Sequence, residues 1–503
     1  MSILIKKDIY MNIYIETLGC CRNQVDSEVM MGRLQSRGHD ICNDPSEAEV
    51  IIVNTCGFIE AASAEAVDTI LAMSGYKSDV GGHGICRHLV VAGCLPERFR
   101  DDTLAEALPE VDVFLGTGAC DLIVEAVEGI GKQSGSSPMI MMPDPCARDF
   151  QGYPLPRKLT LGHTAYVKIS EGCNRHCTYC IIPRLRGRQR SRPMEDVVAE
   201  TRHLLETGVK EIVLVGENTT DYGIDLDSGI SLAPLLLELS GSVDEYHEKS
   251  QSNRDRQSNK VESIRYQSNR YQPNRYHSNQ CQAKRSHVPW LRLLYTHPAS
   301  ITRDMVETIS ARDNICPYFD IPIQHASSKV LKRMGRNYDI DHLHRLFSMI
   351  REIYPEAALR TTVITGFPGE TEADFKTLVE FLQEIRFDHL GVFPYSDSED
   401  LRSHHLKGHL PPLVGEERHD LIMNMQAEIS GQKLEHWIGK TVTVLVEENP
   451  DEGIYLGRTR FQAPEVDGIT FIYASGLEIG EFADINITET HEYDLTGEKV
   501  IKG

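Results

Sequence analysis

Three cysteines stand close together in the run EGCNRHCTYC, where Cys173, Cys177 and Cys180 form a C-x3-C-x2-C triplet directly after the apolar stretch TAYVKIS. Three thiolates on so short a loop can hold three corners of a cube-shaped four-iron cluster. The fourth iron would then lack a protein ligand and could bind a small molecule. The alternative is a structural zinc site, which needs four protein ligands, and the nearest candidates for the fourth, His163 and His176, stand at unfamiliar spacings. The triplet therefore predicts an iron-sulfur cluster with one open iron.

A second set of cysteines follows three apolar, strand-like runs. Cys20 follows NIYIETLG, Cys56 follows EVIIVNT and Cys94 follows HLVVAG, at intervals of 36 and 38 residues. Helix-length segments separate these runs, so the order βαβαβ predicts a parallel sheet with right-handed crossovers. Ligands gather beyond the carboxyl ends of such strands, which predicts that these thiols converge on a second cluster. The alternative is that each packs as a small apolar side chain, and that is the expectation for the cysteines without this regularity: Cys42, Cys86, Cys120, Cys146, Cys281 and Cys316.

Residues from about 160 to 395 repeat a strand-then-helix unit. Six apolar runs, from TAYVKIS to HLGVFPYS, alternate with helical segments such as MEDVVAETRHLLETG, which predicts a partial (β/α)6 barrel. A barrel carries its active site at the rim formed by the carboxyl ends of its strands. Polar or glycine residues that follow these strands are candidate contacts to a cofactor or substrate, although a glycine there usually only makes the turn: Gly216, Glu217, His297, Gln324 and Gly366.

The barrel is interrupted by a segment of different composition, 244–287, which repeats the unit QSNR and has almost no aliphatic residues. It carries nine Lys/Arg against five Asp/Glu. Such a composition cannot build a core, so we expect a disordered insert. A tyrosine- and arginine-rich tail that touches ribosomal RNA is the alternative.

The last part of the chain, 438–503, alternates apolar and polar residues and has turns at ENPDEG and EVDG, which predicts a separate five-stranded barrel. From 439 to 503 it contains 13 Asp/Glu and five Lys/Arg, a balance that would repel a phosphate backbone. A basic protein is the better partner. The residues expected to contact it are Glu465, Asp467, Glu478, Glu481 and Asp484.

Length and composition set the wider limits. A chain of 503 residues is too long for one core, and the features above divide it at 1–150, 151–400, a helical linker over 401–437, and 438–503. The net charge of −22 argues against a general nucleic-acid binder. The start of the chain lacks a signal-peptide pattern and no apolar run reaches about 18 residues, so we expect a cytoplasmic protein, with no membrane partner, whose thiols stay reduced.

The cysteine triplet resembles that of the radical S-adenosylmethionine (SAM) enzymes, and the order of the three regions resembles the methylthiotransferases over nearly the whole chain. The matching runs are LGCCRNQVDSE, IIVNTCGFIE, VVAGCLPER, EGCNRHCTYCIIP, YFDIPIQHAS, ITGFPGETE and APEVDG. They are most similar to the RimO-type branch, which modifies an aspartate of small-subunit ribosomal protein twelve. The resemblance implies an N-terminal cluster domain, a radical SAM barrel and a C-terminal TRAM-like barrel.

The resemblance also implies a reaction and its cofactors. These are SAM and two 4Fe-4S clusters, one held by Cys173, Cys177 and Cys180, the other at the N-terminal cysteines. One SAM molecule donates a methyl group to sulfur at the N-terminal cluster. Another is cleaved to a radical that removes hydrogen from the aspartate β-carbon, so that a carbon-sulfur bond can form. The implied partners are ribosomal protein twelve and an electron donor such as flavodoxin or ferredoxin.

The chain departs from the RimO pattern at two places. It has Cys21 and Arg22 where a proline and a lysine are usual, so Cys21 could compete with Cys20 for the cluster, and it has Glu217 and Asn218 in place of the usual Gln-Asp. Two other functions stay open at this point. One is methylthiolation of tRNA adenosines, as in MiaB-type relatives, although the acidic terminal region disfavours a nucleic-acid substrate; the other is a non-catalytic iron-sulfur protein.

Overall fold

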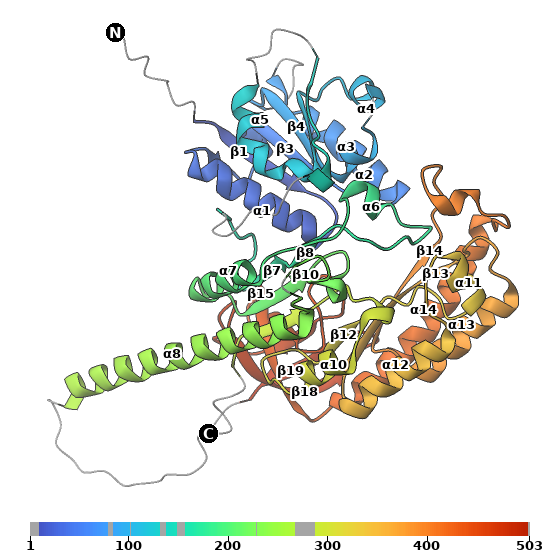
Figure 1. The fold of residues 1–503 in the computed structure, drawn as a ribbon. Helices are drawn as coiled ribbons and strands as arrows, with labels where there is room; N and C mark the ends of the chain where they lie inside the picture. The colour runs from blue at the N-terminus through green and yellow to red at the C-terminus, as the bar shows by residue number, and fades with distance from the viewer. Residues whose placement is uncertain are drawn as a thin grey trace, which may run out of the picture.

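The computed structural model describes residues 10–78, 84–100, 102–130, 137–147, 156–227, 229–266 and 287–500. Three bodies follow one another along the chain: an N-terminal sheet domain in blue and cyan, a barrel in green to orange, and a C-terminal β-barrel in red that packs against the second body (Figure 1). None of the described helices is both long enough and apolar enough to cross a membrane.

The N-terminal domain is a six-stranded parallel sheet in the order β2-β1-β3-β4-β5-β6. The strands are β1 (Asn12–Thr17), β2 (Asp40–Ile41), β3 (Val50–Thr55), β4 (His88–Gly93), β5 (Val113–Gly116) and β6 (Met139–Met141). The three strands that sequence predicted to end at cysteines are β1, β3 and β4, so that prediction is confirmed. Every residue of β3 is buried, because helices cover both faces of the sheet.

Alternate residues of the central strands point to the two layers. Ile52 and Val90 pack toward α1 (Cys21–Ser36) and α5 (Ile123–Gly129). Their neighbours in sequence pack toward the opposite layer, made by α2 (Glu60–Ser74), α3 (Cys94–Arg98) and α4 (Asp102–Ala107). Short 3-10 turns complete the domain: η1 (Pro45–Glu47), η3 (Thr117–Leu122) and η4 (Pro145–Ala147).

The second body is the predicted six-stranded partial barrel. Its strands form two parallel three-stranded sheets, joined where Leu291 pairs with Ile315. They are β7 (Thr164–Lys168), β10 (Glu211–Val215), β11 (Trp290–Leu293), β12 (Tyr318–Asp320), β13 (Ala358–Thr365) and β14 (His389–Pro394). The covering helices are α7 (Met194–Glu206), α8 (Leu232–Tyr266), α10 (Arg303–Ser310), α11 (Ser328–Arg333), α12 (Ile340–Ile353) and α13 (Glu372–Ile385).

Local sequence accounts for several boundaries in this body. Thr371 and Asp374 form a reciprocal capping box that starts α13, as the run TEAD implies. The expected helical linker is α14 (Pro412–Leu434), and it packs on β14 rather than standing free: the Gln426 amide donates to the Phe387 carbonyl over 2.9 Å. Short elements frame the rim: β8 (Ser170–Glu171), β9 (Arg190–Ser191), α6 (Ile182–Leu185), η5 (Thr219–Asp221), η6 (Pro298–Ser300), η7 (Arg402–His405) and η8 (Glu435–Trp437).

The expected disordered insert differs from the structure over its first half. Residues 244–266 continue α8, which extends away from the barrel in Figure 1. Neither glycine nor proline occurs between Ser242 and Pro273, and a helix needs only backbone hydrogen bonds, not a core, to continue. Residues 267–286 of the predicted insert lie outside the described residues.

The C-terminal body is a closed five-stranded barrel, as predicted, in the order β15-β16-β17-β19-β18. Its strands are β15 (Thr441–Asp451), β16 (Ile454–Thr459), β17 (Thr470–Tyr473), β18 (Phe482–Thr490) and β19 (Leu495–Lys499). It covers the concave side of the partial barrel, where Leu445 and Phe482 join Tyr166, Trp290 and other strand residues in one apolar cluster.

A buried ionic group ties the two barrels together. One oxygen of Glu211 accepts from Arg292 over 2.7 Å, and the other accepts from Arg458 of the C-terminal barrel over 2.6 Å. The side chains of Glu211 and Arg292 are fully buried and that of Arg458 is 2% exposed. Removing one partner would leave an uncompensated buried charge, so this contact fixes how the two bodies sit.

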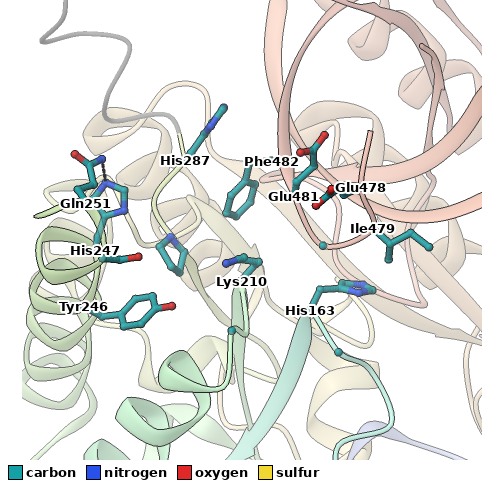
Figure 2. Close-up of a pocket in the computed structure, with 15 residues that line it drawn as sticks. His163, Lys210, Tyr246, His247, Gln251, His287, Glu478, Ile479, Glu481 and Phe482 are labelled. Carbon is teal, nitrogen blue, oxygen red and sulfur yellow. Dashed lines mark hydrogen bonds between the residues drawn. The ribbon is translucent and has the colours of Figure 1, made fainter. Parts of the chain in front are cut away.

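The acidic residues expected to contact a partner do not all face solvent. Asp467 is 1% exposed at its side chain, because it accepts from the Tyr318 hydroxyl and pairs with Arg360 and His389 of the barrel. The expectation that Asp467 meets a partner is therefore wrong. Glu478 and Glu481 line a cavity of about 750 Å³ between the two barrels, opposite Lys210 and beside α8 (Figure 2). Glu465 is exposed, and Asp484 lies near His287 at 3.6 Å.

Candidate active site

The N-terminal cysteines all lie at the carboxyl edge of the parallel sheet. Cys20 is the N-cap of α1, Cys56 follows β3, and Cys94 is the first residue of α3. Gly19 has a positive φ of 91°, and a Cβ there would lie 2.7 Å from the Cβ of Cys56. Only glycine lets the Cys20 turn come this close to Cys56.

The barrel triplet lies on the loop between β8 and α6. The backbone N–H of Arg175 donates to the Cys173 sulfur over 3.4 Å, and the Cys180 N–H donates to the Cys177 carbonyl over 3.2 Å. Thr178 anchors the loop to α11, because its N–H donates to the Met334 carbonyl over 3.0 Å. The loop is therefore held both by its own turns and by the barrel.

Both triplets face one cavity of about 600 Å³ between the sheet domain and the barrel rim. The six thiols come from loops that are up to 160 residues apart in sequence. In the part of the chain that the structure describes, no group of three or more His, Cys, Asp or Glu side chains stands ready to hold a single metal ion. The donor chemistry fits iron-sulfur clusters, because the cavity combines two sets of three thiols with polar groups that can contact a further ligand.

Neither candidate for a fourth zinc ligand lines this cavity. His163 lies at the barrel's other end, where its Nε2 is 3.2 Å from a carboxylate oxygen of Glu447. His176 is exposed. The structure therefore favours the cluster interpretation of the barrel triplet over the zinc interpretation.

Cys21 does not compete with its neighbour. Its side chain is 5% exposed and packs in the apolar cluster between the barrels, 3.4 Å from the Tyr295 hydroxyl. Burial raises the pKa of the Cys21 thiol to about 12. Cys20 and Cys21 leave the start of α1 on different sides, and only Cys20 lines the cavity.

Of the six cysteines that we expected to pack only as apolar side chains, four do so. Cys86 and Cys316 are buried in apolar clusters, while Cys42 and Cys120 are partly buried against them. Cys146 is exposed, so for it the expectation is wrong: its sulfur accepts the N–H of Arg188 over 3.3 Å on a loop at the domain junction. Cys281 lies outside the described residues.

Arg186 reaches from the barrel into the N-terminal domain, and sequence analysis did not single it out. Its guanidinium is 2% exposed and donates to Asn23 over 2.6 Å, lies 3.8 Å from the Cys94 sulfur, and pairs with Asp26 and Glu171. Nothing in the run IIPRLRGRQR distinguishes it from the neighbouring arginines. Only the folded chain places this charge beside the N-terminal thiols.

The positive charges of nearby arginines make the three thiols of the N-terminal triplet differ in pKa. Burial works to raise the pKa of the Cys20 thiol, but the charges of Arg22 and Arg186 outweigh it and hold that pKa below its usual value. Burial raises the pKa of Cys56 and, to about 12, that of Cys94. Cys20 is therefore the most acidic thiol of this set.

In the barrel triplet burial dominates at two positions. It raises the pKa of Cys173 to about 11 and that of Cys180 to about 12, and the neighbouring cysteines act in the same direction. Such thiols stay protonated until a cation stabilises their anionic form.

Glu217 lies on the cavity wall between the two triplets. Its side chain is 2% exposed, and neither carboxylate oxygen has a hydrogen-bond partner among the described residues. The nearest cations are Arg22 and Arg186, each with its Nε 3.7 Å away. Burial and the charge of Glu171 raise the pKa of Glu217. A buried carboxylate without donors is a site at which a ligand can supply them.

Two more of the predicted contacts line the cavity. His297 is held by its Nδ1, which accepts the Ala299 N–H over 3.2 Å, so Nε2 carries the proton. Burial, with the charges of Arg336 and Arg175, lowers the pKa of His297 to about 2, so the ring is a neutral donor. Gln324 has a positive φ of 67°, a strained backbone of the kind that collects at functional sites.

The other two predicted contacts lie elsewhere. Gly216 is not part of the lining, and its carbonyl accepts from Arg22 over 3.0 Å, so it positions that arginine. Gly366 turns away from the cavity, because a Cβ there would lie 2.9 Å from the Cα of Gly415 on α14. The cavity lining does not include these two glycines, and a glycine after a strand can serve packing as well as a ligand.

The comparisons with known proteins cover all three bodies. Residues 12–116 match the family described as uncharacterized protein family UPF0004, residues 167–382 match the radical SAM superfamily, and residues 438–500 match the TRAM domain. Ribosomal protein uS12 methylthiotransferase RimO of Desulfosudis oleivorans is 46% identical over 97% of this chain and 100% of its own length. The chain belongs to the RimO family of methylthiotransferases.

Other RimO proteins match equally broadly. That of Clostridioides difficile is 39% identical over 97% of this chain and 98% of its own length. Among solved structures, the radical SAM methyltransferase TsrM of Kitasatospora setae aligns with a TM-score of 0.48 at 13% identity, over 76% of this chain and 72% of its own. The RimO relatives and the radical SAM match confirm the resemblance found in the sequence motifs: the protein is a radical SAM methylthiotransferase, whose cofactors are SAM and two 4Fe-4S clusters.

Proposed function

We propose that the protein attaches a methylthio group to the β-carbon of an aspartate in small-subunit ribosomal protein uS12, in the cytoplasm, with electrons from a flavodoxin- or ferredoxin-type donor. The observation that carries the proposal is the single cavity of about 600 Å³ that both cysteine triplets line. A reaction that cleaves SAM at one cluster and takes sulfur from another requires both within reach of one bound side chain.

In this proposal Cys173, Cys177 and Cys180 hold the cluster that binds SAM, and Cys20, Cys56 and Cys94 hold the cluster that carries sulfur. The clusters and SAM supply the radical and the methylthio group, which side chains cannot supply because acid-base chemistry does not attack an unactivated C–H bond at neutral pH. The protein therefore needs no general base; its residues bind, orient and exclude water.

The cavity wall offers complementary groups for the methionyl end of SAM. Glu217 has two carboxylate oxygens without hydrogen-bond partners among the described residues, and the ammonium of SAM can donate to them. His297 and Gln324 offer neutral donors on the same wall. Arg22 stacks over Tyr295 at 4.7 Å, which holds its charge between Cys20 and Glu217.

The protein substrate is favoured over tRNA by the charge of the C-terminal barrel. Its 13 acidic and five basic residues over 439–503 repel phosphates and attract a basic protein. Glu465 and Glu478 are exposed and remain surface candidates among the acids named above, whereas the Asp467 side chain is buried against the barrel.

Mass spectrometry of uS12 from cells with and without the gene tests the proposal. We expect the methylthio mass increment on one aspartate only when the gene is present, and the C20A variant should fail to restore it. Bulk tRNA from the same cells is analysed in parallel. An increment on tRNA adenosine in place of uS12 would overturn the choice of substrate.

A further inference from the structure

Lysine and arginine residues gather in three segments around the barrel triplet. The segments are 172–193, which contains the triplet, 328–338, which contains α11, and 401–414, which runs from η7 to the start of α14. They hold six, four and two Lys/Arg and no Asp/Glu, whereas the whole chain holds 52 Lys/Arg and 74 Asp/Glu. An acidic protein that excludes carboxylates from one region has a locally positive potential there.

The second and third segments are both bonded to the cysteine loop through Thr178. Its N–H donates to the Met334 carbonyl over 3.0 Å, and its hydroxyl donates to the Arg333 carbonyl over 2.9 Å. Its own carbonyl accepts from the Ser403 N–H over 2.9 Å. Thr178 follows Cys177 directly, so both segments are attached to the chain one residue from a thiol of the triplet.

The triplet lies close to the molecular surface. Its three cysteines line the cavity, whereas Asn174 and His176 are exposed and are not part of the lining. A Cβ at Gly335 would lie 2.8 Å from the His176 carbonyl, so the turn after α11 packs closely against the cysteine loop. Exposed residues therefore adjoin Cys173 and Cys177 in the chain.

Four cations of α11 and of the loop around η7 have no carboxylate partner among the described residues. We call them the basic surface: Lys332, Arg333, Arg402 and Lys407. All but Arg333 are exposed. Arg333 is partly buried and donates to the backbone carbonyls of Pro368 and Lys407, which do not neutralise its charge.

Most acidic side chains at the edge of the basic surface are engaged elsewhere. Just before η7, Asp400 accepts from Arg98 over 2.9 Å, and Asp397 lies 2.9 Å from a ring nitrogen of His404. Glu399 is exposed. One exposed carboxylate against four cations leaves the surface positive, so it attracts an acidic partner, and this attraction weakens with salt.

We propose that the basic surface binds a small acidic protein that carries one electron. The inference rests on the proposed function, which requires an electron donor, and adds the place at which the donor binds. One electron passes from the bound carrier, which is oxidised, to the cluster at the barrel triplet, which is reduced. Electron transfer slows steeply with distance, which favours a docking surface bonded to the cysteine loop. Four cations are enough, because electron-transfer complexes use small, transient interfaces.

A nucleic acid fits the basic surface less well. Its phosphates would find the same cations, but binding them requires no proximity to the triplet. The net charge of −22 also opposes a long polyanion more than a small protein with a local acidic patch.

The first test measures the binding of a flavodoxin, used as the acidic carrier, to the reconstituted holoenzyme by calorimetry across a salt series. We expect K332E/K407E to raise Kd roughly tenfold, the low end of the range for electrostatic steering, and K332Q/K407Q to raise it less. The matched control is R303E/K376E, which makes the same change of charge at exposed positions of α10 and α13 and should leave Kd unchanged. Equal Kd values in all variants, or binding that does not depend on salt, would overturn the proposal.

The second test follows the release of 5'-deoxyadenosine with two reductants. With reduced flavodoxin, K332E/K407E should need roughly tenfold more carrier to reach its half-maximal rate. With reduced methyl viologen, a small cation that needs no docking surface, its rate should equal that of the wild type. A loss with both reductants at full iron content would overturn the proposal, and K332Q/K407Q takes the place of K332E/K407E if the latter holds less iron.

Two further outcomes are distinguishable in the same experiments. Weaker binding of a ribosomal RNA fragment by K332E/K407E, with an unchanged Kd for flavodoxin, would assign the basic surface to nucleic acid and overturn the proposal. Unmodified uS12 in wild-type reactions that do release 5'-deoxyadenosine would overturn the proposed function and leave the donor surface standing, because both tests of that surface are made without uS12.

Discussion

The two cysteine triplets reach the same cavity by opposite routes. The barrel triplet occupies eight residues of one loop, from Cys173 to Cys180, and its geometry is set by that loop. The N-terminal triplet is assembled from three strand ends between Cys20 and Cys94 and is completed by Arg186 of another domain. The geometry of the barrel triplet is therefore set by local sequence, and that of the N-terminal triplet by tertiary structure. We expect substitutions to affect the two clusters differently.

The largest effect is expected from removing each triplet in turn. The C173A/C177A/C180A variant should keep about half of the iron and release no 5'-deoxyadenosine, because the cluster that cleaves SAM is gone. The C20A/C56A/C94A variant should still release 5'-deoxyadenosine but insert no sulfur. Iron per chain and product analysis after anaerobic reconstitution give the answer. If either variant lost all its iron, the two sites would not be independent and the comparison would break.

Arg186→Met should damage the tertiary site much more than the local one. It leaves Asp26 and Glu171 with Lys168 as their one remaining cation among the described residues, and removing one partner from a buried ionic group typically costs about 3–5 kcal/mol of folding free energy. Denaturant unfolding measures that loss, and cluster spectra should show the N-terminal cluster depleted first. Arg188→Met, at an exposed position two residues on, is the matched control and should change neither quantity. Equal loss of both clusters in R186M would show that Arg186 supports the whole cavity.

Thiol reactivity in the cluster-free protein, measured at two pH values, tests whether the cysteines of the two triplets differ in pKa. The thiolate is the form that reacts, so the lowered pKa of Cys20 predicts that it is alkylated faster than Cys94 and Cys180, whose pKa values are raised to about 12. Peptide mapping after a brief exposure to iodoacetamide at pH 7 and pH 9 reads this directly. Arg22→Met should slow the labelling of Cys20. Faster labelling of Cys180 than of Cys20 at pH 7 would contradict the lowered pKa of Cys20 and the raised pKa of Cys180.

The smallest effect is expected from deleting residues 253–286 and joining the ends with a short Gly/Ser linker. The deletion begins beyond Gln251, the last residue of α8 that lines the cavity between the barrels, and touches neither triplet. Loop-closure entropy changes by only roughly 0.6 kcal/mol per doubling of length, so stability should barely move. Iron content, SAM cleavage and unfolding are measured against the full chain. A variant with full iron but no cleavage would show that this segment contributes to the site.

Much of the architecture was predictable, because it rests on local patterns. The strands that end at Cys20, Cys56 and Cys94, the six barrel strands and the five-stranded C-terminal barrel all occur where apolar periodicity and turn residues indicated. The C-terminal part of α8 was not predicted, because the prediction for that segment rested on its composition alone. Composition decides whether a segment can form a core, but a helix without a proline can continue beyond the core that supports its start.

The sequence by itself determined which thiols could bind clusters, since a C-x3-C-x2-C loop and cysteines at strand ends are properties of residue type and spacing. Only the tertiary structure decided that both triplets share one cavity, that Cys20 faces it while Cys21 does not, and that Asp467 is buried. The physical reason is that burial and electrostatics depend on side chains brought together from distant parts of the chain. Arg186 contacts Cys94 across 92 residues of sequence, and no local pattern records such a contact.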